Sequence, residues 1–480
     1  MPHLSTMLAR SLAEHVDASF DARYLTMATC FIDFQTFYTT SKLKPPVPHT
    51  VIKMAAKAAQ AVVPHRLPPE LWLCVFDFAT DVPGTLIPEV FEQSHLIGQL
   101  YNRKYHPALR VALVTKRNLV LVCKQWWHLA TPYLYRAIYI GKVRCLLSLR
   151  NTLKEYAAGE GTIAGGHRLG SWTQRLDVVI RDHPIGGPDA DAEYLADIVR
   201  HLPSLAIASF AVVPAAYAKH FMPLSVLHAL RGNASSLRVL DWSTDGLRPQ
   251  SIQLEELLKQ LPRLQILNCP GLGWTNGIIP NSLLSSVSTL VLKWLAIPIG
   301  RSDLVDLPEG YVGLREVILN VEWTVQNLWR DFMHHYGRFL TSVQLRAHKD
   351  VHPSTLGAFL GIVNASCPNL CRITISAMTF SHIPVTGLSL PPIEYLGLRA
   401  DARQQRRSAY RHLFSILALL NGNAPKLRVI QLIDRHNVDN LLTSHSKVTV
   451  RALEQQLAGS AFRVEDYNGC LLSGSSICIK

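Results

Sequence analysis

Histidine and cysteine residues are the first candidates for chemistry in this chain of 480 residues. His348 and His352 stand four positions apart, as two metal ligands on one helical face would, but Pro353 follows at once and argues against a shared helix. Cys123 belongs to an apolar helical pattern, where a thiol acts as a small hydrophobic group. The chain contains no H-E-x-x-H, G-x-S-x-G, G-x-x-x-x-G-K-[ST] or G-x-G-x-x-G motif. We therefore predict no catalytic activity, no cofactor and no metal site.

A second kind of chemistry, the binding of anions, is favoured by basic and small polar residues within a repeated six-residue pattern. The pattern has the form L-x-x-L-x-L, and its third, fifth and seventh positions often carry polar residues. Arginine forks and hydroxyl or amide donors suit carboxylate and phosphate groups. We hypothesise that this face binds an acidic or phosphorylated segment of a partner protein, although a solvated sheet face has the same composition. The residues of this candidate substrate-binding site are Lys293, Asn320, Arg346, Arg372, Ser376 and Arg399.

The elements that would position these residues alternate along the chain from about residue 172. Alternation at positions four and six of each copy predicts a strand, whereas the segments between copies carry apolar residues at helical steps of three and four. The copies span 176–180, 205–210, 237–242, 264–269, 287–292, 314–319, 340–345, 370–375, 393–398 and 427–432. The clearest helical segments between them are 192–201, 252–260, 325–336, 355–363 and 410–420.

One strand and one helix per unit, repeated about ten times, predict an irregular α/β solenoid of the leucine-rich-repeat kind. An ordinary α/β domain with a parallel sheet alternates in the same way. Its strands, however, are buried on both faces and read as near-continuous apolar runs. The polar positions between the leucines therefore favour a solenoid whose sheet has one face open to solvent.

Two apolar helices are predicted before the repeats. Residues 65–79 read HRLPPELWLCVFDFA, in which two prolines suit a helix start and an acid lies beside the positive end of the helix dipole. Residues 119–135 read LVLVCKQWWHLATPYLY and repeat apolar residues at helical spacing until Pro132 ends the run. The apolar face of the first helix is too wide for this helix to bury alone, so the helix needs a partner surface. Its apolar residues are Leu67, Leu71, Trp72, Val75, Phe76, Phe78 and Ala79.

Together these segments resemble the F-box, the short three-helix module of substrate receptors in SCF-type cullin-RING ubiquitin ligases. The resemblance rests on L-P-x-E-[LI]-W-x-x-[VI]-F at residues 67–76 and on V-C-[KR]-x-W-x-x-[LI]-A at residues 122–130. The segment PYLYR at 132–136 is also similar to the fungal members of the family. An insertion at 80–118 separates the two halves, and its V-P-G at 82–84 and A-L-V-T-K-R at 112–117 resemble an insertion of the fungal branch.

The resemblance implies a substrate-recognition subunit that binds the SCF adaptor through the F-box, and through the adaptor the cullin and RING subunits. The solenoid would then hold an unknown protein substrate for ubiquitin-dependent degradation. Catalysis would come from the RING subunit and the ubiquitin-conjugating enzyme, so this chain would supply proximity and orientation. The adaptor-binding residues that the resemblance implies are Leu67, Pro68, Pro69, Glu70, Leu71, Val75, Phe76, Leu119, Val122, Cys123 and Trp126.

The sequence divides into four predicted parts. Residues 1–64 have no clear period and are predicted to be poorly ordered. Residues 65–140 form the F-box-like domain with its insertion at 80–118. Residues 141–171 form a linker, with five glycines between 159 and 170. Residues 172–480 form the solenoid.

Composition bounds the partners and the compartment. A net charge of +13 favours an acidic partner, and basic residues also outnumber acids in the F-box-like region, which would suit the acidic adaptor that the resemblance implies. Nine scattered cysteines without a C-x-x-C pair predict neither a disulfide framework nor a zinc module. The sequence shows no secretory signal and no run of eighteen apolar residues. We therefore expect a cytoplasmic or nuclear protein with no membrane contact.

Two other interpretations stay open. The chain could be a leucine-rich-repeat-like interaction scaffold without ligase association, in which the F-box-like helices only cap the array. It could also bind nucleic acid, but that reading rests on net charge and on the arginines between 403 and 411, so we do not expect a nucleic-acid partner.

Overall fold

The fold was obtained as a computed structural model, which describes most of the chain beyond residue 66. Within these residues the chain forms eleven α-helices and one twelve-stranded sheet, so the fold class is α/β. The prediction for residues 1–64 lies outside the described part. The described residues are 67–82, 84–87, 107–159, 168–180, 190–212, 221–242, 247, 249–268, 286–292, 313–321, 326–347, 351–385, 388–401, 407–444, 455 and 459–472.

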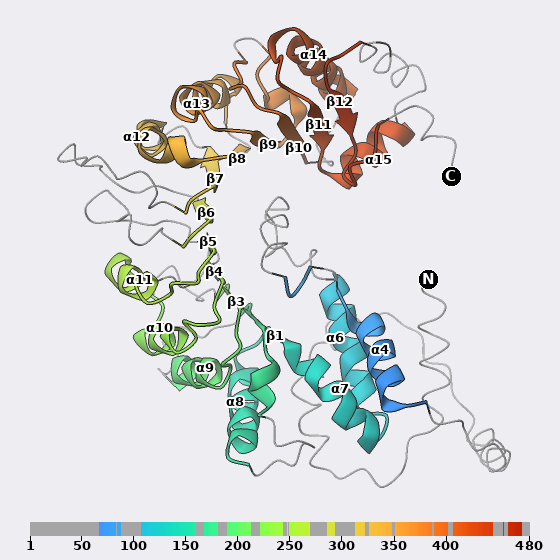
Figure 1. Cartoon of the computed structure of the whole chain (residues 1–480), viewed down its shortest axis with the longest axis vertical. Helices are drawn as coiled ribbons and strands as arrows, with labels where there is room; N and C mark the ends of the chain where they lie inside the picture. The colour runs from blue at the N-terminus through green and yellow to red at the C-terminus, as the bar shows by residue number, and fades with distance from the viewer. Residues whose placement is uncertain are drawn as a thin grey trace, which may run out of the picture.

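Three helices, α4 (Pro69–Thr80), α6 (Pro107–Val120) and α7 (Lys124–Arg136), pack against one another at one end of the molecule (Figure 1). The helix predicted at 65–79 is confirmed as α4, with a proline at its start and Glu70 in its first turn. The prediction that Pro132 ends a helix is wrong, because α7 contains Pro132 and continues to Arg136. Proline removes one backbone hydrogen bond there, while the buried side chains of Tyr133, Leu134 and Tyr135 hold the last turn in place.

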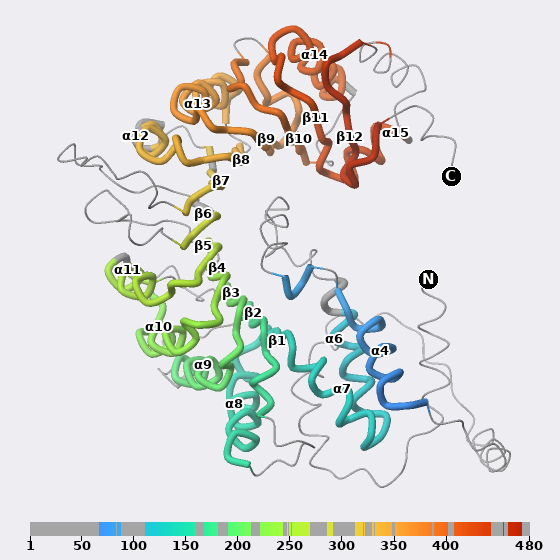
Figure 2. The backbone as a smooth tube through the Cα atoms, in the orientation of Figure 1, coloured from blue at the N-terminus to red at the C-terminus, as the bar shows by residue number. Residues whose placement is uncertain are grey.

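The single sheet has all its strands parallel and in the order in which they occur along the chain. The strands follow the inner side of an arc, and the helices α8 to α13 follow the outer side (Figure 2). Each predicted copy of the six-residue pattern forms a strand. The strands are β1 (Ala137–Ile140), β2 (Arg175–Val178), β3 (Ile207–Phe210), β4 (Val239–Trp242), β5 (Ile266–Asn268), β6 (Thr289–Leu292), β7 (Glu316–Val321), β8 (Ser342–Ala347), β9 (Arg372–Ala377), β10 (Tyr395–Ala400), β11 (Val429–Leu432) and β12 (Arg463–Glu465).

Helices cover the face of the sheet that carries the leucines. The five predicted helices are confirmed within a few residues, and three others were not predicted: α8, α10 and α15. The helices of the array are α8 (Arg144–Ala157), α9 (Ala190–Arg200), α10 (Leu224–Arg231), α11 (Ser251–Leu258), α12 (Gln326–Tyr336), α13 (Pro353–Ser366), α14 (Arg407–Asn423) and α15 (Arg435–Ser444). No helix in the described ranges combines the length and the apolar character needed to cross a membrane.

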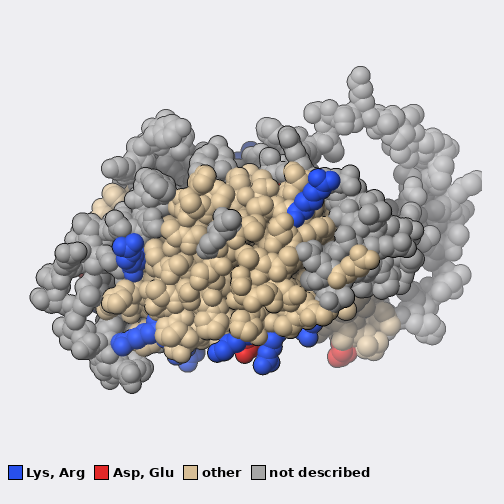
Figure 3. Space-filling model, turned by 90° about the horizontal axis from the view of Figure 1, so that it is seen from above, with Lys and Arg blue, Asp and Glu red and all other residues tan. Residues whose placement is uncertain are grey.

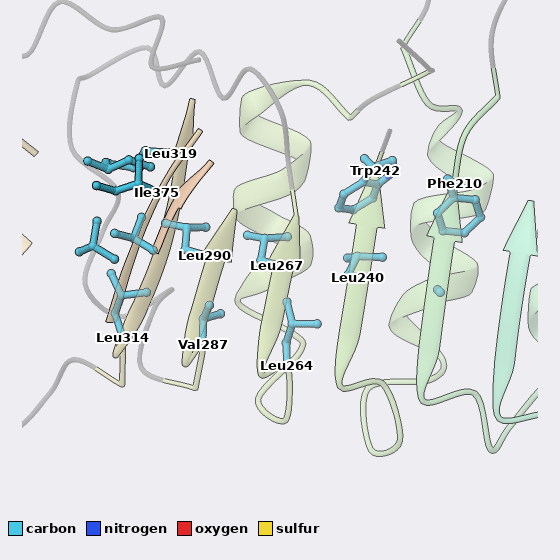
Figure 4. Close-up of a cluster of buried hydrophobic side chains, with 14 of the residues drawn as sticks. Phe210, Leu240, Trp242, Leu264, Leu267, Val287, Leu290, Leu314, Leu319 and Ile375 are labelled. Carbon is cyan, nitrogen blue, oxygen red and sulfur yellow. The ribbon is translucent and has the colours of Figure 1, made fainter. Parts of the chain in front are cut away.

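The core follows from the period of two along each strand, since alternate side chains point to opposite faces. Leu240, Leu267 and Leu290 are partners in register on β4, β5 and β6, and they lie level with one another on neighbouring strands (Figure 4). One continuous cluster of buried apolar residues extends from Phe76 in α4 to Leu472 after β12. The three N-terminal helices therefore share one core with the array.

The predicted linker at 141–171 is wrong in its first half. Residues 144–157 form α8, whose Leu146, Leu149 and Leu153 are buried in the core, and the sheet already begins with β1 at residue 137. The strand β1 was missed because its four residues follow α7 directly and have no full copy of the repeat pattern. The array therefore starts some thirty-five residues before the predicted boundary at 172.

The sheet face opposite the leucines is less open than predicted. Its central positions are buried, among them Asp241, Gln344 and Thr374. At one end of this face, Ile207, Val239 and Ile266 form a small apolar cluster separate from the main core. Because the strands lie on the inner side of an arc, side chains on this face are crowded together. The residues at the two edges of the face keep more contact with solvent, among them Ser342, Arg346, Arg372, Ser376, Tyr395 and Arg399.

Candidate protein-interaction sites

Helix α4 presents an unusual apolar stripe on its outer side. Leu71 is 49% exposed and Phe78 is 89% exposed, and Leu67 and Val75 are also exposed. Leu71, Val75 and Phe78 are separated by steps of four and three, which places them on one face of the helix, and Leu67 lies two residues before the helix begins. Isolated apolar residues on a surface are ordinary, whereas several exposed apolar side chains on one side make a candidate interaction site.

The opposite side of α4 packs inside the protein. The ring of Phe76 is fully buried, with its centroid 4.9 Å from that of Trp126, and the Trp72 and Trp126 centroids are 4.6 Å apart. The hydroxyl of Tyr133 donates to the carbonyl oxygen of Leu73 over 3.1 Å, which fixes α7 against α4. These contacts join the two halves of the motif across the insertion.

The eleven predicted adaptor-binding residues therefore fall into buried, half-buried and exposed groups. Phe76, Leu119 and Trp126 are buried within this chain, where their side chains pack in the internal core. Pro68, Pro69 and Glu70 are exposed beside the stripe, and Val122 and Cys123 are half-buried. The prediction omitted Phe78, although its spacing from Leu71 and Val75 already placed it on the same face. It also omitted two exposed valines of α6, Val111 and Val114.

A polar junction connects these helices to the sheet. Arg136 pairs with Asp77 at 3.1 Å, while Arg175 of β2 pairs with Asp177 and also donates from Nη1 to the carbonyl oxygen of Thr85 over 2.9 Å. The start of the insertion therefore lies against the first strands. A cavity of about 10 Å³, room for about one water molecule, lies at this junction between residues of all three helices and the insertion.

Lys116 lines the same cavity and is buried. Burial, and then the charge of Arg136, lower the pKa of Lys116 to about 8, while Asp81 and Asp77 act in the opposite direction. The charges of Asp77 and Asp81 favour the protonated form of this lysine, and because Lys116 is buried it is not presented to a partner. This junction is a structural feature that fixes the helices relative to the sheet.

The structure brings together only some residues of the candidate substrate-binding site. Ser376 of β9 is in register with Arg346 of β8 on one side and with Arg399 of β10 on the other. Arg372 lies at the opposite edge of the face, four residues earlier on β9, with its guanidinium 4.2 Å from the centroid of the Tyr395 ring. Lys293 and the side chain of Asn320 lie outside the described part. Of the six predicted residues, the structure therefore brings together Arg346, Ser376 and Arg399.

The charged side chains around Arg346, Ser376 and Arg399 lie near one another and are partly buried. Burial, and then the charge of Arg399, lower the pKa of Arg346 to about 10, while the charges of Asp241 and Glu316 act in the opposite direction. Burial raises the pKa of Asp241 to about 7, while a hydrogen bond from Asn268 and the charge of Arg346 oppose this shift. Seen from above, charged side chains lie mainly at the margins of the last repeats (Figure 3), and α13 carries none.

Among the described residues, no group of three histidine, cysteine or acidic side chains is placed to hold a metal ion. The six described cysteines are free, and burial raises the pKa of the Cys367 thiol to about 12. The fold and its surfaces thus define an α/β protein whose parallel strands form one arc and whose N-terminal helix exposes an apolar stripe. No protein-family model matches the sequence, and no curated protein matches it.

Proposed function

We propose that this protein is the substrate-recognition subunit of an SCF-type cullin-RING ubiquitin ligase. In this account it is an F-box protein of the fungal type with a leucine-rich-repeat-like solenoid. The stripe of Leu67, Leu71, Val75 and Phe78 on α4 is the observation that carries the proposal. It is the exposed face of the helix whose sequence carries the L-P-x-E-[LI]-W resemblance.

Covering the apolar side chains of the stripe would contribute enough free energy to support binding of a partner. Covering a half-exposed leucine or valine contributes about 1 kcal/mol, and covering the almost fully exposed Phe78 contributes about 2 kcal/mol. Large apolar side chains at the centre of an interface usually carry most of its binding energy. In the proposed complex, the adaptor subunit covers this stripe, with Pro68, Pro69 and Glu70 at its edge.

The shared core supports a role in positioning a substrate. Helix α7 leads without a break into β1, and the buried cluster runs from α4 through the whole sheet. A target held by the solenoid would therefore keep a fixed orientation relative to the adaptor. In this proposal the chain is not an enzyme: the RING subunit and the ubiquitin-conjugating enzyme supply the chemistry, and the chain works in the cytoplasm or nucleus without a cofactor.

The core that the three helices share with the sheet also favours a second function. The helices α4, α6 and α7 cover the end of the array, as terminal caps of repeat proteins do. The protein could therefore be a repeat scaffold that binds other proteins without a ligase. A cap needs a polar outer face, however, and the exposed stripe of α4 favours the ligase subunit.

Co-purification separates the two functions. Tagged wild-type protein should bring down the adaptor and cullin, whereas a variant with Leu71→Asp and Phe78→Asp should lose both and retain its other partners. The matched control is Leu147→Asp, which changes a similarly exposed leucine on α8. Retention of cullin by the double variant, or an equal loss in the control, would contradict the proposal.

A further inference from the structure

Ile207, Val239 and Ile266 lie on the inner face of the sheet, at the start of three neighbouring strands. They are partners in register on β3, β4 and β5, and they form an apolar cluster separate from the main core. Their exposed fractions are 0%, 0% and 1%. Side chains on one face of a sheet stand next to one another, so neighbours on adjacent strands cover their flanks but not their tips. Complete burial therefore requires other chain to lie over this cluster.

Val429 provides an internal comparison for Val239. Each valine is the first residue of its strand, and both belong to one row of partners in register that runs from Arg175 in β2 to Arg463 in β12. Val429 is half-buried, whereas Val239 has no contact with solvent. The curvature of the arc acts on both positions, so curvature alone does not account for the difference. The cover is therefore local to the early strands.

The insertion between α4 and α6 meets the sheet beside this cluster. Arg175, the partner of Ile207 in register, donates from Nη1 to the carbonyl oxygen of Thr85 over 2.9 Å. Because neighbouring strands are about 4.8 Å apart, Thr85 lies about one side-chain length from the first strand of the cluster. The chain then continues through residues 88–106, which lie outside the described part, before α6 begins at Pro107.

The length and composition of residues 88–106 suit this surface. The three strands of the cluster span about 10 Å, a distance that about three extended residues cover. The segment reads PEVFEQSHLIGQLYNRKYH, and it supplies large apolar side chains that bury favourably against valine and isoleucine. Those apolar residues are Val90, Phe91, Leu96, Ile97 and Leu100.

Other segments outside the described part begin farther from the cluster. The N-terminal residues lead into the start of α4, whereas the end of α4 near Asp81 meets β1 at the junction cavity. The twelve residues of α4 separate these two ends by about 18 Å. The loops after β3, β4 and β5 leave from the opposite ends of these strands, since the cluster consists of their first residues. The insertion is therefore the best-placed segment.

We propose that the inner face of β3, β4 and β5 is a docking site for this chain's own insertion, and that apolar residues within 88–106 cover Ile207, Val239 and Ile266. The insertion then occupies the early repeats in place of an external partner. Partner binding is left to the strands from β7 onward, where residues of the same row keep contact with solvent. The proposed ligase function is not needed for this inference, because an internal cover forms with or without an adaptor.

Thiol labelling of the full-length protein tests whether the cover exists. Val239→Cys and Val429→Cys place a small thiol at two matched positions of the row, and peptide mass spectrometry separates them from the native cysteines. In the otherwise unchanged protein, the thiol at position 239 should react with a maleimide at least a hundredfold more slowly than the thiol at position 429. Equal labelling rates at the two positions would overturn the cover.

Changes to the insertion then test which segment forms the cover. Replacing residues 88–106 with glycine and serine at equal length should speed labelling at position 239 at least tenfold and leave position 429 unchanged. Phe91→Ser combined with Ile97→Ser should act in the same direction, and it decides the matter if the full replacement prevents folding. The matched control is Glu89→Ser combined with Gln99→Ser, which changes polar positions of the same segment and should leave labelling slow.

The remaining outcomes would assign the cover to another segment. Faster labelling at position 239 after removal of residues 1–64, but not after the change to the insertion, would overturn the proposal in favour of the N-terminal residues. Slow labelling in both altered proteins would overturn it in favour of a loop of the array. These measurements do not include the adaptor, so their failure and the failure of co-purification are distinguishable.

Discussion

Leu71 and Phe76 lie five residues apart on α4, and Leu71 faces solvent whereas Phe76 faces the protein core. Five residues turn a helix by about 140°, so Leu71 is half exposed while Phe76 is enclosed between Trp72, Trp126 and Tyr133. One helix thus supplies both an internal anchor and an external surface. The two roles can be separated by mutation.

Truncating these two residues should have different effects on stability. Phe76→Ala should lower the free energy of unfolding by about 3–5 kcal/mol, because it leaves a cavity among packed aromatic rings. Leu71→Ala should change it by less than about 1 kcal/mol, since its side chain is half in water. Urea unfolding of the two variants measures both values. Equal losses would show that the two faces of α4 are not distinct.

The ion pair of Arg175 and Asp177 should matter more than a similar pair elsewhere. Both side chains are buried, and Arg175 also binds the carbonyl oxygen of Thr85. Arg175→Ala would leave a buried carboxylate without its main partner and should cost about 3 kcal/mol or more. Arg463 pairs with Glu465 at the same spacing along β12 but is largely exposed, so Arg463→Ala should cost less than about 1 kcal/mol.

Chemical denaturation of both variants tests this comparison. Hydrogen exchange at residues 84–87 gives a second readout, because the start of the insertion is tied to β2 through Arg175. Exchange there should speed up in Arg175→Ala and stay unchanged in Arg463→Ala. Similar costs for the two substitutions would contradict the burial of the Arg175 pair.

Asp241 should make stability depend on pH. Burial raises the pKa of its carboxyl from 3.8 to about 7 in the folded protein. The folded state therefore binds more protons than the unfolded state between pH 4 and pH 7, and stability falls as the pH rises through that range. The loss from this one group is on the order of 4 kcal/mol at its full extent.

The substitution Asp241→Asn isolates this effect. The amide keeps the size of the side chain but carries no charge, so the variant should be more stable than wild type at pH 8 and should lose this advantage near pH 4. Urea unfolding at several pH values measures the difference. An advantage that does not change between pH 4 and pH 8 would refute the raised pKa.

Gly397 is required by close packing on the inner face of β10. A Cβ atom at this position would lie 2.6 Å from Ile433 Cδ1 and 2.9 Å from Thr374 Oγ1. Gly397→Ala should therefore destabilise the protein by about 1–3 kcal/mol through overpacking. Gly361→Ala on α13 is the control, because its Cβ meets nothing within 4 Å and should stabilise the helix by about 0.5–1 kcal/mol. Thermal unfolding of both variants should show midpoints that move in opposite directions.

Much of the fold could be predicted because a local period determines it. Apolar residues two positions apart, such as Leu240 and Trp242 of β4 or Leu290 and Leu292 of β6, specify strands, and the helices between them follow from three- and four-residue spacing. The strand β1 and the helix α8 were missed because they follow α7 without a repeat signature. The buried inner face could not be read from the pattern, since Asp241 and Gln344 are polar by type and their burial depends on the whole arc.

The candidate sites were predicted in part for the same reason. Sequence spacing placed Leu71, Val75 and Phe78 on one face of α4, but it could not show that Phe76 packs against Trp126, fifty residues away. Register between strands joined Arg346 and Arg399, whereas Arg372 lies at the other edge of the sheet because four residues of a strand span about 13 Å. Contacts between distant segments decide these cases, and spacing along the chain does not contain them.

Direct titration of the purified protein with the purified adaptor subunit of the SCF complex tests the central claim most directly. The account predicts saturable one-to-one binding by wild type and by Leu147→Asp, and a loss of at least a hundredfold in affinity for the folded Leu71→Asp, Phe78→Asp variant. Absence of binding by the wild-type protein, or equal affinity in the double variant, would contradict the assignment of the α4 stripe as the adaptor site.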